Sequence, residues 1–409
     1  MARNPSASRA SGAPDVVLPR FVLMLVVLGL TLLGFVMIFS ASSISAISEQ
    51  TDASSYLVDQ LFFAVLGLIG AFLVWKVFPY RMWLGPLLWA FWGLSLVLLL
   101  LTAVMGNEAL GAQRWLTLGP VSLQPSELAK IAFVLMASRL LYDYKQGEFD
   151  FRGLAVATLL LVVLPIGFLY FTQSDLGTTA IIALGLLGVM WFGEVPLRWI
   201  LVVVVALVGF AVAAIFLVSY RADRLLYLDP WNDGQGGYGN GYQIIHSFYA
   251  FAEGGIFGVG LGNSREKYLY LPESETDFIF AIIGEELGLI GAVLVIAAFL
   301  VFLWAGLQIA RASADPFGRM VAGALVIMLV FQAFLNIGCA IGVFPTTGKP
   351  LPFISSGGSS LIATFVMVGI IFSVSDGSMP GRSDYDQRRE SLRVVRVADE
   401  GRAPRRSRR

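Results

Sequence analysis

Hydrophobic residues run along this chain in long blocks that short polar stretches separate. Blocks of about 20 apolar residues, the length that crosses about 30 Å of hydrocarbon, recur between residues 21 and 376. The pattern predicts about ten membrane-spanning helices. They lie near residues 21–45, 56–79, 82–105, 127–143, 153–171, 176–193, 197–219, 278–305, 318–345 and 357–376. We therefore expect an all-α, polytopic integral membrane protein.

The polar segments divide the chain into three parts. Residues 1–20 are rich in Ser, Ala and Pro, and residues 377–409 are polar and end Arg-Arg-Ser-Arg-Arg, so both are predicted to be disordered tails around a membrane domain, 21–376. Inside that domain, residues 220–277 form a large predicted extracytoplasmic loop between spans 7 and 8. An apolar stretch at 242–252 is too short to span the bilayer and predicts an interfacial or re-entrant helix.

Composition agrees with a membrane protein, because only 14% of the residues are charged against about 25% in soluble domains. Ten spans put both termini on one side, and most Lys and Arg residues lie in the tails and in the loops after spans 2, 4, 6 and 8. Since positive charge stays in the cytoplasm, both tails are predicted to be cytoplasmic. The basic tail could attract anionic membrane lipid, although a solvated topological anchor is the simpler interpretation.

Several classes of site are excluded at this level. A single histidine, His246, argues against a multi-histidine metal site, and a single cysteine, Cys339, excludes an intrachain disulfide. The glycines at 258, 260 and 262 resemble a dinucleotide fingerprint, but no strand is predicted before them. We therefore expect no organic cofactor and no nucleic-acid partner.

Carboxylates gather where span 8 begins on the outer face. Asp277 stands at the predicted helix start, where it or Thr276 could simply cap the helix. Glu285 and Glu286 lie inside the following span. Ionisable residues in a membrane are costly and mark either a functional site or a buried partner. For these two glutamates the alternative to a catalytic cavity is an ion pair with cations of span 4, Lys130 or Arg139.

Cations and hydroxyls are predicted on the same face. Arg114 and Lys130 lie at or just below the outer surface, and Lys349 precedes a Gly/Ser-rich helix start at 355–360, which is suited to anions. Asp175, in a very short connection, is interpreted as a helix N-cap. One carboxylate among several cations suits an anionic lipid headgroup that carries a hydroxyl to be deprotonated.

Five motifs occur in an order that resembles one known family. They are RWLTLG and LQPSELAK within 114–130, QSDLGT at 173–178, DPW with its glycine-rich continuation at 229–264, LPESETDFIFAIIGEELGLIG at 271–291 and LPFISSGGSSL at 351–361. The chain resembles the SEDS family (shape, elongation, division and sporulation), and its cell-division branch in particular, over residues 21–376. It departs from the family at Glu275, Ser174 and Ser356, where His, Pro and Tyr are usual.

The resemblance implies a peptidoglycan glycosyltransferase that polymerises lipid II into glycan strands during septal wall synthesis. It places the protein in the bacterial cytoplasmic (inner) membrane, at the division septum. The implied partners are a class B penicillin-binding protein acting as transpeptidase, other divisome membrane proteins, and glycan linked to undecaprenyl diphosphate. A lipid II flippase, an elongation-type polymerase and a structural scaffold for the divisome are the alternatives.

The resemblance and the residue types together give the expected roles. Asp277 is the predicted catalytic base, or else a ligand of Mg²⁺ or another divalent cation. The predicted substrate-binding residues are Arg114, Lys130, Lys349, Ser355, Ser359, Glu285 and Glu286.

Overall fold

The computed structural model describes residues 16–48, 50–52, 54–109, 112–118, 121–216, 229–239 and 241–378. Residues 1–15 and 379–409, nearly all of the two predicted tails, lie outside the described residues. The α-helices are α1 (Val17–Ser48), α2 (Ser55–Phe72), α3 (Pro86–Met105), α4 (Pro125–Lys145), α5 (Phe151–Thr158), α6 (Leu164–Gln173), α7 (Leu176–Phe192), α8 (Leu197–Phe216), α10 (Tyr242–Gly254), α11 (Ile279–Ala312), α12 (Pro316–Ala340) and α13 (Gly358–Gly377).

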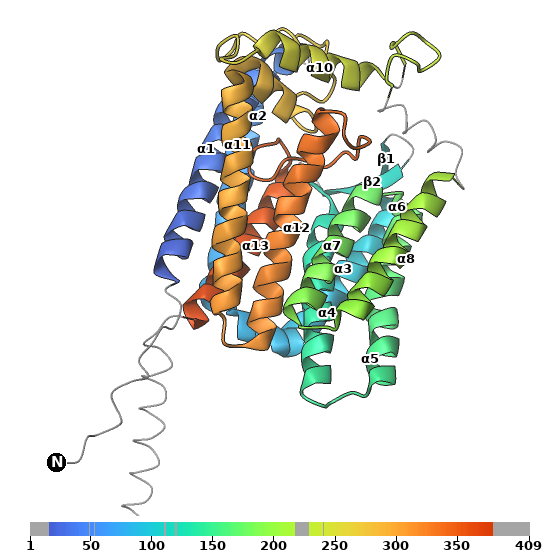
Figure 1. Ribbon diagram of the computed structural model, residues 1–409. Helices are drawn as coiled ribbons and strands as arrows, with labels where there is room; N and C mark the ends of the chain where they lie inside the picture. Colours follow the sequence, from blue (N-terminus) through green and yellow to red (C-terminus); the bar gives the residue numbers. More distant parts are fainter. Residues whose placement is uncertain are drawn as a thin grey trace, which may run out of the picture.

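The long helices form one bundle with roughly parallel axes (Figure 1). Seven helical segments in the described chain are long and apolar enough to cross a membrane, and α4, α7 and α8 run beside them. The predicted ten-span membrane architecture is confirmed, with shifted ends. α1 and α11 are longer than expected, and the ninth span ends at residue 340 rather than 345.

Two regions depart from straight α-helix. The π-helix η1 (Leu73–Val77) continues α2, and the 3-10 helix η2 (Tyr80–Leu84) precedes α3. A small antiparallel sheet, absent from the all-α prediction, follows α3: β1 (Asn107–Ala109), β2 (Ala112–Leu118) and β3 (Val121–Leu123), in that order. This sheet lies at the same end of the bundle as α10 (Figure 1).

The fifth span is one segment that a proline divides. The π-helix η3 (Leu159–Val163) joins α5 to α6, and Pro165 follows it in the first turn of α6. A proline cannot donate to the carbonyl four residues earlier, which here belongs to Leu161. The indole of Trp92 on α3 donates to that carbonyl at 2.9 Å instead. The carbonyl that has lost its helical donor is thus hydrogen-bonded by the neighbouring helix α3.

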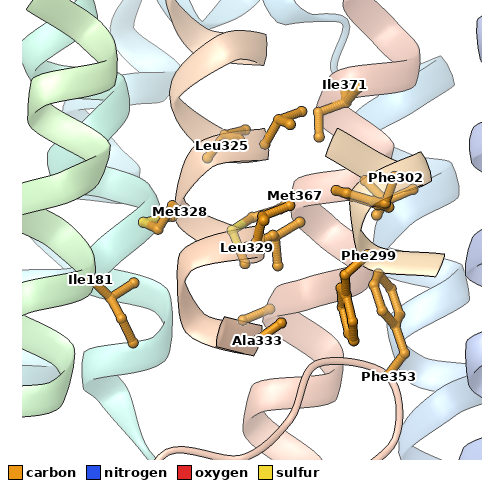
Figure 2. Packing of buried hydrophobic residues seen from close by; sticks show 14 of the residues in the cluster. Ile181, Phe299, Phe302, Leu325, Met328, Leu329, Ala333, Phe353, Met367 and Ile371 are labelled. Carbon is orange, nitrogen blue, oxygen red and sulfur yellow. The ribbon is translucent and has the colours of Figure 1, made fainter. Parts of the chain in front are cut away.

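α12 is the central helix of the bundle and the most buried of the seven spans. Figure 2 shows Met328 facing Ile181 of α7, whereas Leu329 faces Met367 of α13. Phe299 of α11 and Phe353 lie beyond them, on the side away from α7. α12 therefore packs against α7 on one side and against α11 and α13 on the other.

Charged residues connect the two ends of the described chain. Asp376 at the end of α13 pairs with Arg20 at the start of α1, and it accepts from Lys76 and Trp75 of η1 at 2.8 Å each. Both ends of the chain's membrane domain therefore lie on one face. α10 lies across the opposite face (Figure 1), as an interfacial helix would, and Ser247 donates from it to the carbonyl of Ala340 at 2.6 Å.

α11 is interrupted at Gly288, whose φ of 68° and ψ of −167° are not helical. The amides of Val259 and Gly260 donate to the freed carbonyls of Glu285 and Glu286, at 2.9 and 3.0 Å. The loop after α10 therefore replaces the missing helical hydrogen bonds, as irregular backbone near a membrane requires.

The interruption divides α11 into a short part, 279–287, and a longer part, 289–312. The longer part alone, about 36 Å at 1.5 Å per residue, is enough to span about 30 Å of hydrocarbon. The short part is buried at nearly all of its positions, including Glu285 and Glu286.

Gly288→Ala should strongly destabilise the protein. A Cβ at Gly288 would lie 2.3 Å from the amide nitrogen of Gly258, and a positive φ alone costs a non-glycine residue about 1–2 kcal/mol. Thermal melting of the detergent-solubilised protein measures the effect. The matched control is Gly29→Ala in α1, where nothing lies within 4 Å of the new Cβ. Equal melting temperatures for the two variants would contradict the proposed role of the interruption.

Candidate functional site

Asp277 lies just before α11 and does not cap it. The N-cap residue is Phe278, which makes no side-chain cap bond, so the predicted capping role of Asp277 or Thr276 is wrong. Thr276 instead donates to a carboxylate oxygen of Glu273 at 2.7 Å. No hydrogen bond or ion pair reaches the Asp277 carboxylate from the described part of the chain. That carboxylate is therefore available for chemistry.

The backbone that carries Asp277 is held by three successive bonds from the other side of the site. Ser356 donates its amide to the carbonyl of Glu275 at 2.9 Å, and the hydroxyl of Ser355 donates to the carbonyl of Thr276 at 2.5 Å. Asn336 of α12 donates its side-chain amide to the carbonyl of Asp277 at 2.8 Å. The segment therefore has a fixed place although its acidic side chain is free.

The surroundings of Asp277 make it a stronger base than an ordinary aspartate. Burial and then the nearby charge of Glu273 raise the pKa of Asp277 to about 6, and Lys349 and Arg114 offset only part of this rise. Gly348 lies directly against the carboxylate, because a Cβ built on that glycine would be 3.5 Å from Oδ2. A carboxylate with this pKa is mostly ionised at neutral pH and can accept a proton.

A buried ion pair stands beside it. Lys349 donates to Asp175 at 2.7 Å, and both side chains are 1% exposed. Asp175 is the N-cap of α7, as predicted, and accepts from the amide of Thr178 at 2.9 Å. Burial opposes ionisation of Asp175, but Lys349 and then Arg114 keep its pKa below the usual value. Lys349 is therefore committed to a partner.

Arg114 of β2 lies against the short connection from α6 to α7, which carries Asp175. Its Nε donates to the carbonyl of Gln173 at 2.9 Å, and a terminal nitrogen donates to the carbonyl of Ser174 at 3.1 Å. The side chain remains only partly buried. Arg114 is thus the most accessible of the three cations expected to meet an anionic substrate.

Lys130 is fully buried and has protein partners. It pairs with Glu127 one turn away on α4 at 2.6 Å, and it donates to the side-chain oxygen of Gln332 on α12 at 2.8 Å. The sequence alternative that paired it with Glu285 or Glu286 is wrong. Its assignment to substrate binding remains a prediction.

Glu285 and Glu286 hold the loop that follows α10. Glu285 accepts from the hydroxyl of Ser264 and from the amide of Arg265, each at 2.5 Å. Glu286 pairs with Lys267 at 3.2 Å. These partners belong to the loop, and none of the contacts described for the two carboxylates reaches α4.

Arg139 of α4 and Ser40 of α1 complete this correction. Arg139, the other proposed partner of the two glutamates, pairs with Asp143 on its own helix. Glu286 accepts instead from Ser40 of α1 at 2.6 Å. The substrate-binding roles of Glu285 and Glu286 are untested, and every polar contact described for their carboxylates fixes the loop at 264–267 or its junction with α1.

The hydroxyls of the α12–α13 connection, residues 341–357, and of the α13 start are also engaged. Ser355 accepts from the amide of Leu351 at 2.8 Å in addition to its bond to residue 276. Ser359 accepts from the amide of Gln124 at 3.0 Å and donates to the carbonyl of Ser122 at 3.2 Å. These serines bind protein segments in this structure, while their predicted contact with substrate stays a prediction.

Four buried polar side chains near these ion pairs retain atoms without a partner in the described structure. They are Ser126, Glu127, Gln173, whose two amide atoms are both unpaired, and Asn336. Buried polar groups are almost always hydrogen-bonded to protein or to ordered water.

Sequence reasoning missed Asn336 and Gln332. They are buried amides four residues apart on α12, so they share one face. Gln332 donates to the carbonyl of Pro350 at 2.9 Å, and Asn336 donates to that of Lys349 at 2.8 Å. Two amides at helical spacing in an otherwise apolar span were the available signal.

Comparison with known proteins shows the family of the chain. Residues 20–379 match the model of the family described as cell cycle protein, which groups FtsW, RodA and SpoVE. A probable peptidoglycan glycosyltransferase FtsW of Geobacter metallireducens is 40% identical over 358 residues, which are 87% of this chain and 94% of that protein. Stage V sporulation protein E of Bacillus subtilis is 37% identical over 361 residues, 87% of this chain and 97% of that protein.

Solved structures resemble the fold throughout. A chain from a peptidoglycan synthase complex, described as coordinating polymerization and crosslinking, superposes with a TM-score of 0.68 at 29% identity and covers 88% of this chain and 98% of its own. The rod shape determining protein RodA of Thermus thermophilus gives a TM-score of 0.63 at 29% identity, over 87% and 95% of the two chains. This chain therefore belongs to the SEDS family of multi-pass membrane proteins, the family of FtsW, RodA and SpoVE.

Proposed function

We propose that this protein is a peptidoglycan glycosyltransferase of the FtsW type, which polymerises lipid II into glycan strands during septal wall synthesis. The observation that carries the proposal is the Asp277 carboxylate, free of partners within the described chain and raised to a pKa of about 6, on a backbone held by three hydrogen bonds. The activity in the names of relatives that share most of the chain supports it.

The chemistry is an inverting glycosyl transfer. Asp277 takes the proton from a sugar hydroxyl of the acceptor, lipid II, as a general base. The hydroxyl oxygen then forms a bond to the anomeric carbon of the growing glycan, and the bond from that carbon to undecaprenyl diphosphate breaks. The diphosphate is a good leaving group, so the site needs positive charge near it rather than an acid.

Arg114 is the side chain best suited to meet that diphosphate. Its guanidinium uses two of its nitrogens for the carbonyls of residues 173 and 174 and stays partly exposed. Lys130 and Lys349 are buried in ion pairs, so they contribute charge without contacting the ligand unless those pairs open.

A divalent cation fits this site only together with its substrate. The described residues contain no cluster of three or more His, Cys, Asp or Glu that could hold one. Mg²⁺ is commonly bound through one or two carboxylates plus substrate phosphates and water, so Asp277 could be its protein ligand when the diphosphate is present. Such an ion would supply charge neutralisation there.

We place the protein in the bacterial cytoplasmic membrane, at the septum, with both termini in the cytoplasm. The distribution of Lys and Arg supports this orientation, and it puts Asp277 and α10 on the outer face. The partner we propose is a class B penicillin-binding protein with other divisome membrane proteins. The similarity to a chain of a complex for polymerization and crosslinking supports it.

A lipid II flippase is the alternative from another class. Transport would require a polar route from the inner leaflet. The observation against it is that the unpaired base and the backbone bonds that hold it lie where α11 begins, on the α10 side of the bundle. An elongation-type polymerase remains the alternative within the family, and the similarity to RodA is consistent with the same chemistry.

Asp277→Asn should abolish polymerisation while leaving the protein folded. The change keeps the size of the side chain and removes the basic oxygen, and general-base contributions are typically about 10²–10⁴-fold. Purified protein with its transpeptidase partner is incubated with lipid II, and glycan ladders are resolved on a gel. Glu253→Gln, on the exposed face of α10, is the control. Parental ladders from Asp277→Asn would remove Asp277 from the mechanism, whereas absence of ladders from the parent protein would bring the flippase forward.

The rate of polymerisation should fall as pH drops through about 6. Protonation of Asp277 removes the base, so the rate should decrease about tenfold per pH unit below the pKa. Glu273→Gln removes a like charge that raises this pKa, so the midpoint of the acidic limb should move to lower pH. Turnover as a function of pH in both proteins measures the shift. An identical midpoint would mean that the limb reports another group.

Reporter fusions should establish the orientation. Fusions after residue 150 and after residue 376 should read cytoplasmic, and fusions within 230–270 should read external, because positive loops remain inside. A cytoplasmic signal from the 230–270 fusions would reverse the orientation and place Asp277 on the wrong side for lipid-linked polymerisation.

A further inference from the structure

Asn336 of α12 stands where two segments of the site meet. Its side chain is 1% exposed. Its amide nitrogen donates at 2.8 Å to the carbonyl of Asp277 and at 2.8 Å to the carbonyl of Lys349. A side-chain amide has two donor hydrogens, so both are used. One side chain therefore joins the segment that carries the proposed base to the α12–α13 connection.

The connection that Asn336 holds forms the surroundings of the Asp277 carboxylate. Gly348, next to Lys349, has a φ of 65° and lies against Oδ2 of Asp277. The ammonium of Lys349 pairs with Asp175. If the bonds from Asn336 were lost, Asp277 could move relative to both this backbone and the buried ion pair.

The two donor bonds are what an apolar residue of similar size would lack at this position. Leucine would fill the same space, but it would leave the carbonyls of Asp277 and Lys349 without this donor. The side chain of Asn336 therefore does more than pack.

We propose that Asn336 is a positioning residue for the glycosyl transfer, which fixes Asp277 against residues 348 and 349 so that its carboxylate meets the reacting hydroxyl. The inference rests on the proposed function, because it assumes that Asp277 is the base. Asn336 acts through Asp277 and touches no substrate.

The test is Asn336→Leu in the full chain, assayed with its transpeptidase partner on lipid II. We expect kcat to fall about 10–100-fold, since a displacement near 1 Å can cost about 10²-fold, while KM stays within about twofold. The midpoint of the acidic limb of the pH profile should also move, because the base changes its surroundings. Thermal melting should fall only modestly, because two carbonyls lose a donor while the core packing is kept.

The matched control is Ser247→Ala, which removes another side-chain bond to α12, to the carbonyl of Ala340, and no bond to residues 275–277 or 349. Its kcat should be unchanged. Asn336→Ala provides a second variant should the leucine variant fail to fold. A parental kcat in either folded Asn336 variant would overturn the proposal, as would a lower rate with an unchanged acidic limb and a lower melting temperature.

Failure of this inference can be told apart from failure of the proposed function. An inactive Asp277→Asn with a fully active Asn336→Leu would refute the positioning role alone. An active Asp277→Asn would refute the proposed base whatever Asn336→Leu does.

Discussion

Polar groups buried among membrane helices must find partners inside the protein, and this requirement organises the half of the bundle next to α10. α12 is apolar along most of its length, yet it presents Gln332 and Asn336 on one face. Their side-chain amides donate hydrogen bonds to the carbonyls of Pro350 and Lys349, at 2.9 and 2.8 Å. The connection to α13 is thereby held against the core helix, and the ion pair between Lys349 and Asp175 fixes the start of α7 to it. Removing one partner of such a buried ion pair typically costs about 3–5 kcal/mol of folding stability. The α12–α13 connection and the start of α7 are therefore held together.

The same requirement explains how α11 can be interrupted while its backbone groups keep hydrogen-bond partners. The interruption at Gly288 leaves carbonyls and amides that no water in the hydrocarbon could satisfy, and the loop after α10 supplies their partners. Glu285 and Glu286 add side-chain bonds to Ser264 and Lys267 of that loop. The short part of α11, 279–287, is therefore a unit with the loop. Glutamates inside a membrane domain are costly without partners, and this pair is tolerated because the loop and Ser40 of α1 supply its donors.

Much of the fold follows from local pattern, and most of the site does not. Apolar blocks of spanning length predicted the bundle, a short apolar stretch predicted α10, and an aspartate before an apolar run predicted the N-cap at Asp175. Each signal is contained within a few neighbouring residues. The partners of Lys130, Glu285 and Glu286 depend instead on which helices pack together, and a single sequence does not contain that information. The wrong pairing of span 4 with span 8 arose because charges were matched by sign and depth alone. Asn336 escaped notice for the same reason, since its two acceptors are backbone carbonyls 59 and 13 residues away.

Two aspartates in this site have the same chemistry and opposite surroundings. Asp175 faces Lys349 and Arg114 and is held ionised, with a pKa below the usual value. Asp277 shares the neighbourhood of those cations but has no direct partner, and its pKa rises to about 6. If Lys349 turned from Asp175 to Asp277, the charge would stabilise the carboxylate and make it a weaker base. Because Lys349 pairs with Asp175, its charge stabilises Asp277 less and the pKa of Asp277 stays raised. The buried ion pair therefore has a structural role and also affects how readily Asp277 accepts a proton. Environments that push the pKa values of two acids apart are a common way for one site to give them different roles.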